Sequence, residues 1–186
     1  MAENNIRRVR KLYDWEVKEF STVFGNSLDT NRVRIHEFAT WTDWIDRLGR
    51  FLKRMPPPGL HEHNAITLGN HLFFPVGLPE GLLPVNDQMS FKHDWLVHEL
   101  THAWQYQHMG WRYLFKALLA QFREKSKAYD FEGEQGLLKS RHKGRIFKNF
   151  NPEQQGNIAQ SYYLRKRRGL DTSAWDPYID EIKKMA

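Results

Sequence analysis

Residues 90–110 have the sequence SFKHDWLVHELTHAWQYQHMG, with the pentapeptide His98-Glu99-Leu100-Thr101-His102 near their centre. Positions four apart lie nearly in register on one face of an α-helix, so the two imidazoles can be directed at one point. Two imidazoles aimed at one point are what a single helix can contribute to a tetrahedral Zn²⁺ site. Glu99 lies about 100° further round the helix, beside the metal, where it could take a proton from water as a general base. The segment therefore predicts a zinc-dependent hydrolase built around one helix.

The rest of this segment predicts a capped helix with one buried face. Four apolar side chains fall opposite the histidines: Leu96, Leu100, Ala103 and Trp104. Asp94 and Gln105 lie on the histidine side, where either could hydrogen-bond a ligand imidazole and fix its tautomer. Ser90 is expected to cap the start of the helix, and Gly110 to end it in a left-handed conformation.

Composition indicates one globular domain over residues 1–186. Hydrophobic residues make up 40% of the chain and aromatic residues 14%, which argues against wholesale disorder. The chain has no cysteine, so a disulfide scaffold and a thiolate zinc site are both excluded. Any metal must therefore be held by histidine, aspartate or glutamate.

The charge of the chain is uneven. The formal net charge is +6, and residues 123–168 hold twelve Lys or Arg against five Asp or Glu, including the run Arg165-Lys166-Arg167-Arg168. Such a surface could attract nucleic acid, an anionic membrane or an acidic protein. A run of cations is also typical of a helix end, where it suits the negative pole of the helix dipole. No nucleic-acid motif lies nearby, so we favour the second interpretation and do not expect a nucleic-acid partner.

The sequence predicts no membrane segment and no secretion signal. No apolar run approaches the length of a transmembrane helix. The basic N-terminal residues are not followed by the apolar region of a signal peptide. We therefore expect synthesis as a soluble chain in the cytoplasm.

Hydrophobic periodicity predicts an α+β fold that is mostly helical, with a few short strands. Further helices are expected at residues 4–20, 111–123, 151–168, where Asn151 and Pro152 form the start and Gly169 the end, and 177–184. A half-buried strand is expected at 32–36 and a hairpin at 65–74, bent at Gly69-Asn70. The remaining segments are expected to be irregular or to hold short elements: 41–52, broken by the prolines at 56–58, then 75–87 and 126–150.

A zinc site needs a third protein ligand, and one candidate is His108. It stands six residues after His102, the spacing of metzincins, which use a glycine to break the helix so that the third histidine can turn back. Here Gln105 occupies the glycine position and favours continuation of the helix. His108 would then lie about 9 Å further along the helix axis, pointing away from the pair.

The other candidates are carboxylates from later in the chain: Glu124, Glu132, Glu134 and Glu153. Glu153 lies in the first turn of a predicted helix, where the dipole favours the ionised form that a metal needs. Gly156, one turn later, would permit close approach of another helix. The residues alone leave the choice open between Glu153 and the other three.

The run Leu96-Val97-His98-Glu99-Leu100-Thr101-His102-Ala103-Trp104-Gln105 resembles the HELTHxWQ signature of small bacterial zincin-like metallopeptidase domains. The preceding AITLGN at 65–70 and the later NPEQQ at 151–155 are also similar to that family. Its best-known relatives are toxic C-terminal extensions of spike proteins in type VI secretion systems. The resemblance covers roughly residues 23–165.

The resemblance implies a minimal zincin-like fold with a gluzincin site. His98, His102 and Glu153 would hold Zn²⁺, Glu99 would be the base, and residues 65–74 would supply the strand beside the active-site helix. It also implies a spike carrier, an immunity or inhibitor protein, and a periplasmic target in another bacterium. No carrier domain precedes the motif in this sequence, so a free-standing effector, a housekeeping peptidase and an excised domain all stay open.

We therefore expect a zinc endopeptidase that acts on protein or peptide. A donor for the oxyanion is also required, and the candidates are Tyr129, His142, Tyr162 and Tyr163. The alternatives are a hydrolase of peptidoglycan peptides, a nucleic-acid-associated basic protein, and a non-catalytic zincin-like binding module. Glu99 argues against the last, because zinc binding alone does not require a base.

Overall fold

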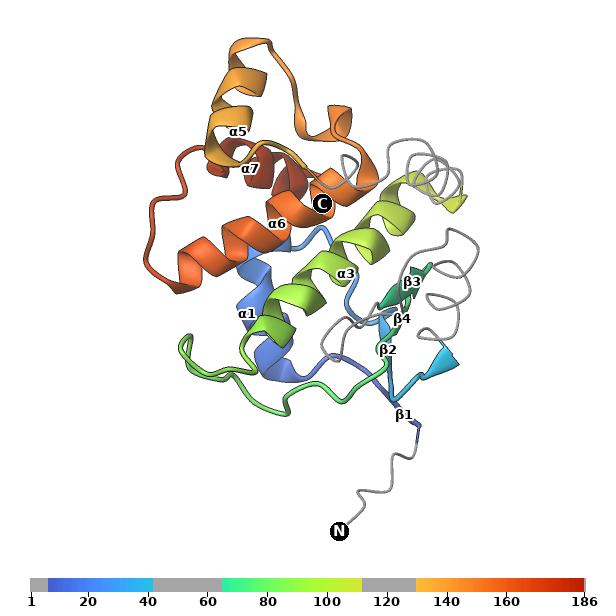
Figure 1. Cartoon of the computed structure of the whole chain (residues 1–186). Coiled ribbons are helices and arrows are strands. Elements are labelled where there is room, and N and C mark those ends of the chain that lie inside the picture. Colours follow the sequence, from blue (N-terminus) through green and yellow to red (C-terminus); the bar gives the residue numbers. More distant parts are fainter. Residues whose placement is uncertain (1–6, 42–64, 112–129, 186) are drawn as a thin grey trace, which may run out of the picture.

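The computed structural model describes residues 7–41, 65–111 and 130–185 (Figure 1). The strands are β1 Arg8–Arg10, β2 Arg34–Glu37, β3 Ile66–Leu68 and β4 His71–Phe73. The helices are α1 Asp14–Phe24, α3 Phe91–Met109, α5 Gly133–His142, α6 Pro152–Arg167 and α7 Asp176–Lys184, with the 3₁₀ turn η2 at Phe147–Asn149. The α+β class predicted from the sequence is confirmed. That residues 1–186 form one domain stays a prediction.

Several predictions fall outside the described residues. They concern most of the helix at 111–123, nearly all of the segment at 41–52 with the prolines after it, and the start of the helix at 4–20. The ligand candidate Glu124 and the oxyanion candidate Tyr129 also lie there.

The small mixed sheet has the strand order β1-β2-β4-β3. Its outer pairs, β1–β2 and β3–β4, are antiparallel, and its central pair, β2–β4, is parallel. The predicted hairpin is present, with Gly69 at φ +65° in its turn, a conformation that favours glycine. Strand β3 ends the sheet and contacts α3, so the expected strand does lie beside this helix.

Helix α3 forms the centre of the molecule, between the sheet on one side and α6 on the other (Figure 1). Its predicted apolar face is buried: Leu96, Leu100, Ala103 and Trp104 are each at most 1% exposed. The indole of Trp104 donates a hydrogen bond to Ser27 Oγ at 2.9 Å. Because neighbours cover several sides of α3, its polar residues are also largely buried.

Helices α3 and α6 approach closely at Gly156. A Cβ atom there would lie only 2.7 Å from Cε1 of His98, a separation that real Cβ contacts do not show. The absence of a side chain therefore lets the ring of His98 lie against the backbone of α6. The close approach expected at this glycine is confirmed.

The N-terminal helix predicted at residues 4–20 is wrong at its start. Residues 8–10 form β1, and α1 begins only at Asp14. The reason is pairing: Val9 lies opposite His36 of β2 with its side chain 59% exposed, so it is no part of a buried helical face. At the other end α1 continues to Phe24, because Val23 and Phe24 are buried in the core.

The caps of α3 also differ from expectation. Ser90 stands at the start, but its hydroxyl donates to the carbonyl of Val85 at 3.1 Å instead of capping the helix. Gly110 ends the helix at φ +65° and ψ −169°, which is not the left-handed helical conformation that was predicted.

The C-terminal helices agree with the sequence. Asn151 Oδ1 accepts from the amide of Gln154 at 2.9 Å, and the Gln154 side chain accepts from the amide of Asn151 at 3.2 Å. This reciprocal pair starts α6 as predicted. Helix α7 begins at Asp176, one residue before its predicted start. Between residues 126 and 150, the expected short elements are α5 and η2.

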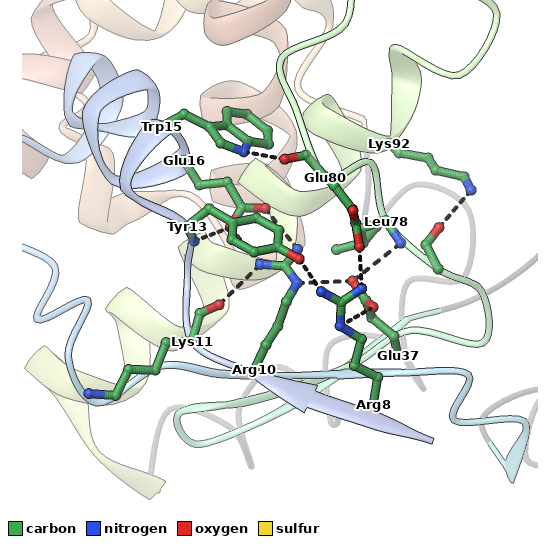
Figure 2. Close-up of polar contacts among 11 residues, drawn as sticks. Arg8, Arg10, Lys11, Tyr13, Trp15, Glu16, Glu37, Leu78, Glu80 and Lys92 are labelled. Carbon is green, nitrogen blue, oxygen red and sulfur yellow. Dashed lines mark hydrogen bonds and ion pairs between the residues drawn. The ribbon is translucent and has the colours of Figure 1, made fainter. Parts of the chain in front are cut away.

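A buried group of charges joins β1, α1 and β2, and we call Arg10, Glu16 and Glu37 the Arg10 cluster (Figure 2). The guanidinium of Arg10 donates twice to Glu16, at 2.6 and 2.9 Å, and once to Glu37 at 3.0 Å. The three side chains are 8%, 1% and 2% exposed. The cluster therefore fixes the N-terminal strand to the helix and strand that follow it.

None of the helices in the described ranges combines the length and apolarity that crossing a membrane would require.

Candidate metal centre

Three side chains direct one ligand atom each at a common point. His98 Nε2 lies 3.2 Å from His102 Nε2 and 3.3 Å from Glu153 Oε2, and the remaining pair is 3.7 Å apart. With metal–ligand bonds of about 2.0–2.1 Å, two ligand atoms of a tetrahedral site lie about 3.3–3.4 Å apart. The donor set of two imidazoles and one carboxylate therefore has the type and the spacing of a group that could hold a metal ion.

Two helices supply these side chains. His98 and His102 stand one turn apart in the middle of α3, as their spacing predicted. Glu153 lies in the first turn of α6, where the positive end of the helix dipole favours a carboxylate. The contact at Gly156 brings that first turn within reach of the histidines. The structure thus brings together the three residues singled out as metal ligands.

The charges of this group are coupled. Burial by itself would raise the pKa of Glu153, but His102 and His98 outweigh it and hold that pKa well below its usual range. Burial by itself would lower the pKa of His102, but the Glu153 carboxylate raises it to about 9. At neutral pH and without a metal, Glu153 is therefore ionised and His102 is protonated. Metal binding requires the ionised carboxylate and a neutral imidazole, so it would displace one proton from His102.

Gln105 orients one of the histidines, as expected. Its Oε1 lies 2.7 Å from His102 Nδ1, on the side of the ring opposite to the ligand atom. Asp94, the other residue considered for this role, has no hydrogen bond to either imidazole in the described part of the chain. Burial raises the pKa of Asp94 to about 6, against the opposing charges of Arg167 and Arg168.

Glu99 lies next to the ligand group, is 5% exposed, and has a partner that the sequence analysis missed. The hydroxyl of Thr67 donates to Glu99 Oε2 at 2.6 Å. Thr67 is the middle residue of β3, between half-buried Ile66 and exposed Leu68, and its side chain points inward. A polar residue at an inward position of the strand beside α3 is the signal that could have identified it.

The other ligand candidates lie elsewhere. His108 Nε2 is 2.7 Å from the carbonyl of Ser27, and its ring packs on Trp104. Glu134 pairs with Arg165 at 3.5 Å, and Glu132, at the start of α5, lies 3.9 Å from Lys139. The structure therefore brings Glu153 to the histidines and leaves these three residues apart from them.

The described candidates for an oxyanion donor have other contacts. The hydroxyl of Tyr163 donates to Glu19 Oε1 at 3.1 Å, and burial raises its pKa strongly. The hydroxyl of Tyr162 accepts from Lys166 at 3.4 Å, and His142 is exposed at the end of α5. The structure gives none of them a contact with the ligand group, so the donor stays a prediction.

Part of the basic run near the end of α6 contacts the protein itself. Arg165 lies over the ring of Trp175 at 4.3 Å and donates to the carbonyl of Asp171 at 2.6 Å. Arg167 lies 3.6 Å from Glu19 and donates to the carbonyl of Leu83 at 2.5 Å. These contacts favour a structural role for two of the four cations in the run.

Comparison with known proteins gives one informative relative. The chain is 27% identical over 180 residues to the type VI secretion system spike protein VgrG2b of Pseudomonas aeruginosa. The match covers 95% of this chain but only 15% of that protein, so the chain spans a small part of its relative's length. No protein-family model and no solved structure matches the chain. The comparison links the chain to part of a spike protein and assigns it no activity.

Proposed function

We propose that this chain is a zinc-dependent metallopeptidase with a gluzincin-type site, in which His98, His102 and Glu153 hold the metal. The convergence of these three ligand atoms, with Glu99 as the next residue on α3, is the observation that carries the proposal. When bound there, Zn²⁺ would supply Lewis-acid polarisation of a peptide carbonyl and would lower the pKa of a water molecule.

Zinc is the metal that this donor set suits best. Imidazole ligands suit zinc, copper, iron and nickel, whereas calcium and magnesium prefer oxygen ligands throughout. The spacing of the three atoms matches tetrahedral geometry, which zinc adopts with His and Glu ligands. Three protein ligands leave a fourth position for water or substrate, as catalytic zinc sites require.

Glu99 is the proposed general base. Its carboxylate accepts a hydrogen bond from Thr67, and its charge acts on His102. Glu99 would take a proton from the attacking water, whose oxygen bonds to the peptide carbonyl carbon, and would deliver that proton to the leaving amine as the C–N bond breaks. Thr67 donates to Oε2 of this carboxylate, so the transfer would use the other oxygen, Oε1.

The proposed substrate is protein or peptide in the periplasm of a target bacterium. The relative's name supports a type VI route, because that protein is a secretion spike. We infer that a spike carrier delivers the chain and that the producing cell makes an immunity protein against it. Peptides of peptidoglycan are the alternative substrate in the same compartment.

Glu99→Ala tests the mechanism. The wild-type protein is expected to bind one zinc per chain and to cleave an unfolded protein such as casein. Glu99→Ala should keep the zinc, measured by elemental analysis, and lose cleavage, because the base is not a ligand. Glu134→Ala, which removes a surface carboxylate paired with Arg165, is the matched control and should cleave normally.

Three outcomes would change the proposal. Cleavage by Glu99→Ala at the wild-type rate would remove Glu99 from the mechanism. Zinc-loaded wild type that cleaves muropeptides and not casein would move the substrate to peptidoglycan. Wild type that binds zinc and cleaves neither would make the chain a non-catalytic binding module.

A further inference from the structure

Two buried glutamines connect His102 with the turn that precedes α6. Gln105 and Gln155 are 1% and 0% exposed. Gln105 Nε2 lies 3.0 Å from Gln155 Oε1, and Gln105 Oε1 lies 2.7 Å from His102 Nδ1. Since neither amide can exchange these partners for bulk water, the direction of each hydrogen bond matters for the histidine.

The donor and acceptor groups of Gln155, at the end of these contacts furthest from His102, can be assigned from their partners. Gln155 Nε2 lies 3.1 Å from the carbonyl of Phe147 and 2.9 Å from the carbonyl of Phe150. Carbonyl oxygens only accept, so the group that faces them must be the NH₂ of the amide. The other end of the Gln155 amide is therefore its oxygen, which accepts from Gln105.

The orientation of the Gln155 amide then fixes the orientation of the Gln105 amide. Its NH₂ has two hydrogens, and it meets two acceptors, Gln155 Oε1 and the carbonyl of Pro152, each at 3.0 Å. The oxygen of the Gln105 amide remains, and it can only accept from His102 Nδ1. Nδ1 must therefore carry a proton, which leaves the lone pair of the neutral ring on Nε2, the atom that faces His98 and Glu153.

We propose that Gln155 is a positioning residue that, through Gln105, holds His102 in the tautomer that binds metal through Nε2. The inference rests on the metal site of the proposed function and not on peptidase activity. A second hydrogen bond gives the same pair another role. The carbonyl that Gln105 binds belongs to Pro152, the residue before Glu153, so one side chain orients His102 and holds the start of the helix that carries the third ligand.

The first test needs no substitution. In the zinc-loaded wild-type protein, ¹⁵N NMR of the His102 ring should show Nε2 bound to metal and a slowly exchanging proton on Nδ1. The side-chain amide protons of Gln105 and Gln155 should exchange slowly as well, because all of them are buried and bonded. A metal-bound Nδ1, or a fast-exchanging Nδ1 proton, would overturn the proposal.

The second test is a double-mutant cycle on zinc affinity, measured by competition with a chromophoric chelator. Gln155→Leu and Gln105→Leu should each weaken zinc binding by about tenfold or more, as the loss of an outer partner of a ligand does. Because Gln155 acts through Gln105, the double variant should bind zinc no more weakly than Gln105→Leu alone. Additive losses, or no loss in Gln155→Leu, would overturn the proposal.

Gln154→Leu is the matched control. Gln154 is the neighbouring residue in the same helical turn, but its side chain bonds the amide of Asn151 and the carbonyl of Asp130 and has no contact with Gln105. It should disturb the start of α6 and leave zinc affinity within about threefold of wild type, short of the loss expected for a ligand's partner. A loss in Gln154→Leu equal to that in Gln155→Leu would assign the effect to the helix start instead.

The failures can be told apart. Wild type that binds no zinc removes the metal centre itself, and this inference with it. Wild type that binds zinc while Gln155→Leu matches Gln154→Leu overturns this inference alone. If Gln155→Leu does not fold, the NMR measurement on the wild type still decides the proposal.

Discussion

The Arg10 cluster and the candidate metal centre are two buried groups of charged side chains with different partners. In the Arg10 cluster, two carboxylates meet the buried guanidinium of Arg10, and Glu37 also lies 3.9 Å from the guanidinium of Arg8 (Figure 2). In the metal centre, one carboxylate meets two imidazoles. All three glutamates are at most 6% exposed, so each needs a nearby positive charge to remain ionised.

The difference lies in whether the positive charge belongs permanently to the chain. The guanidinium of Arg10 stays protonated at any accessible pH, and its donors reach both carboxylates at once. An imidazole can instead be neutral and offer a lone pair, so the positive charge at His98 and His102 can come from an ion. The first group is complete within the protein, and the second has the composition of a site for an external cation.

The largest expected effect concerns the histidines. His98→Ala or His102→Ala should abolish the binding of one zinc per chain, because each removes a ligand from the three that the protein supplies. Elemental analysis after dialysis measures the stoichiometry. Full zinc occupancy in either variant would show that the histidine is not needed to hold the metal. The candidate metal centre would then be, like the Arg10 cluster, a buried charge group and not a cation site.

Arg10→Met should act on folding and not on zinc. It leaves Glu16 buried without its guanidinium and Glu37 with only the longer contact to Arg8 at 3.9 Å, which should lower the free energy of unfolding by about 3–5 kcal/mol. Zinc affinity of the folded protein should be unchanged. Urea unfolding and chelator competition measure the two quantities separately.

Arg8→Met is the control for Arg10→Met on the same strand. Arg8 is 44% exposed and pairs with Glu80, which is 72% exposed. Its contact with Glu37 of the Arg10 cluster is longer, at 3.9 Å, so its loss should cost less than about 1 kcal/mol. Equal losses in the free energy of unfolding of the two variants would show that the burial of Arg10 does not make its ion pairs more stabilising than those of Arg8.

The features that sequence could predict depend on residues close together in the chain. The spacing of His98 and His102, the cap at Asn151 and the turn at Gly69 are each decided within a few residues. Local patterns of this kind need no knowledge of the rest of the fold. They were enough to predict α3, α6 and the β3–β4 hairpin.

The missed features depend on contacts between distant segments. Thr67 reaches Glu99 from 32 positions away, and Gln155 reaches Gln105 from 50. The short strand β1 is defined by its pairing with β2 rather than by its own sequence pattern, so residues 8–10 were assigned to a helix. Glu153 could be ranked from its own helical turn, but its distance from the histidines depends on how α6 packs on α3.

Glu153→Ala should weaken zinc binding by at least about 100-fold, since even the loss of an outer partner of a ligand reaches 10–100-fold. His108→Ala removes a histidine of the same helix that bonds Ser27, and it should change zinc affinity little. Competition with a chromophoric chelator measures both. The opposite ranking would make this a metzincin-like site, and no loss in either variant would point to Glu124, which lies outside the described residues.

The last prediction concerns Thr67, which joins the sheet to the proposed base. Thr67→Val keeps the shape of the side chain but removes the hydroxyl that donates to Glu99 at 2.6 Å. Zinc affinity should stay the same, because Thr67 has no hydrogen bond to the three proposed ligands. The value of kcat should fall about tenfold with KM nearly constant, since a hydrogen bond to a charged group contributes about 1.5–3 kcal/mol. Thr67→Ser, which keeps the hydroxyl, should recover most of the lost rate. A fall in zinc affinity, or equal rates for Val and Ser, would show that Thr67 supports the packing of β3 on α3 and does not orient the base.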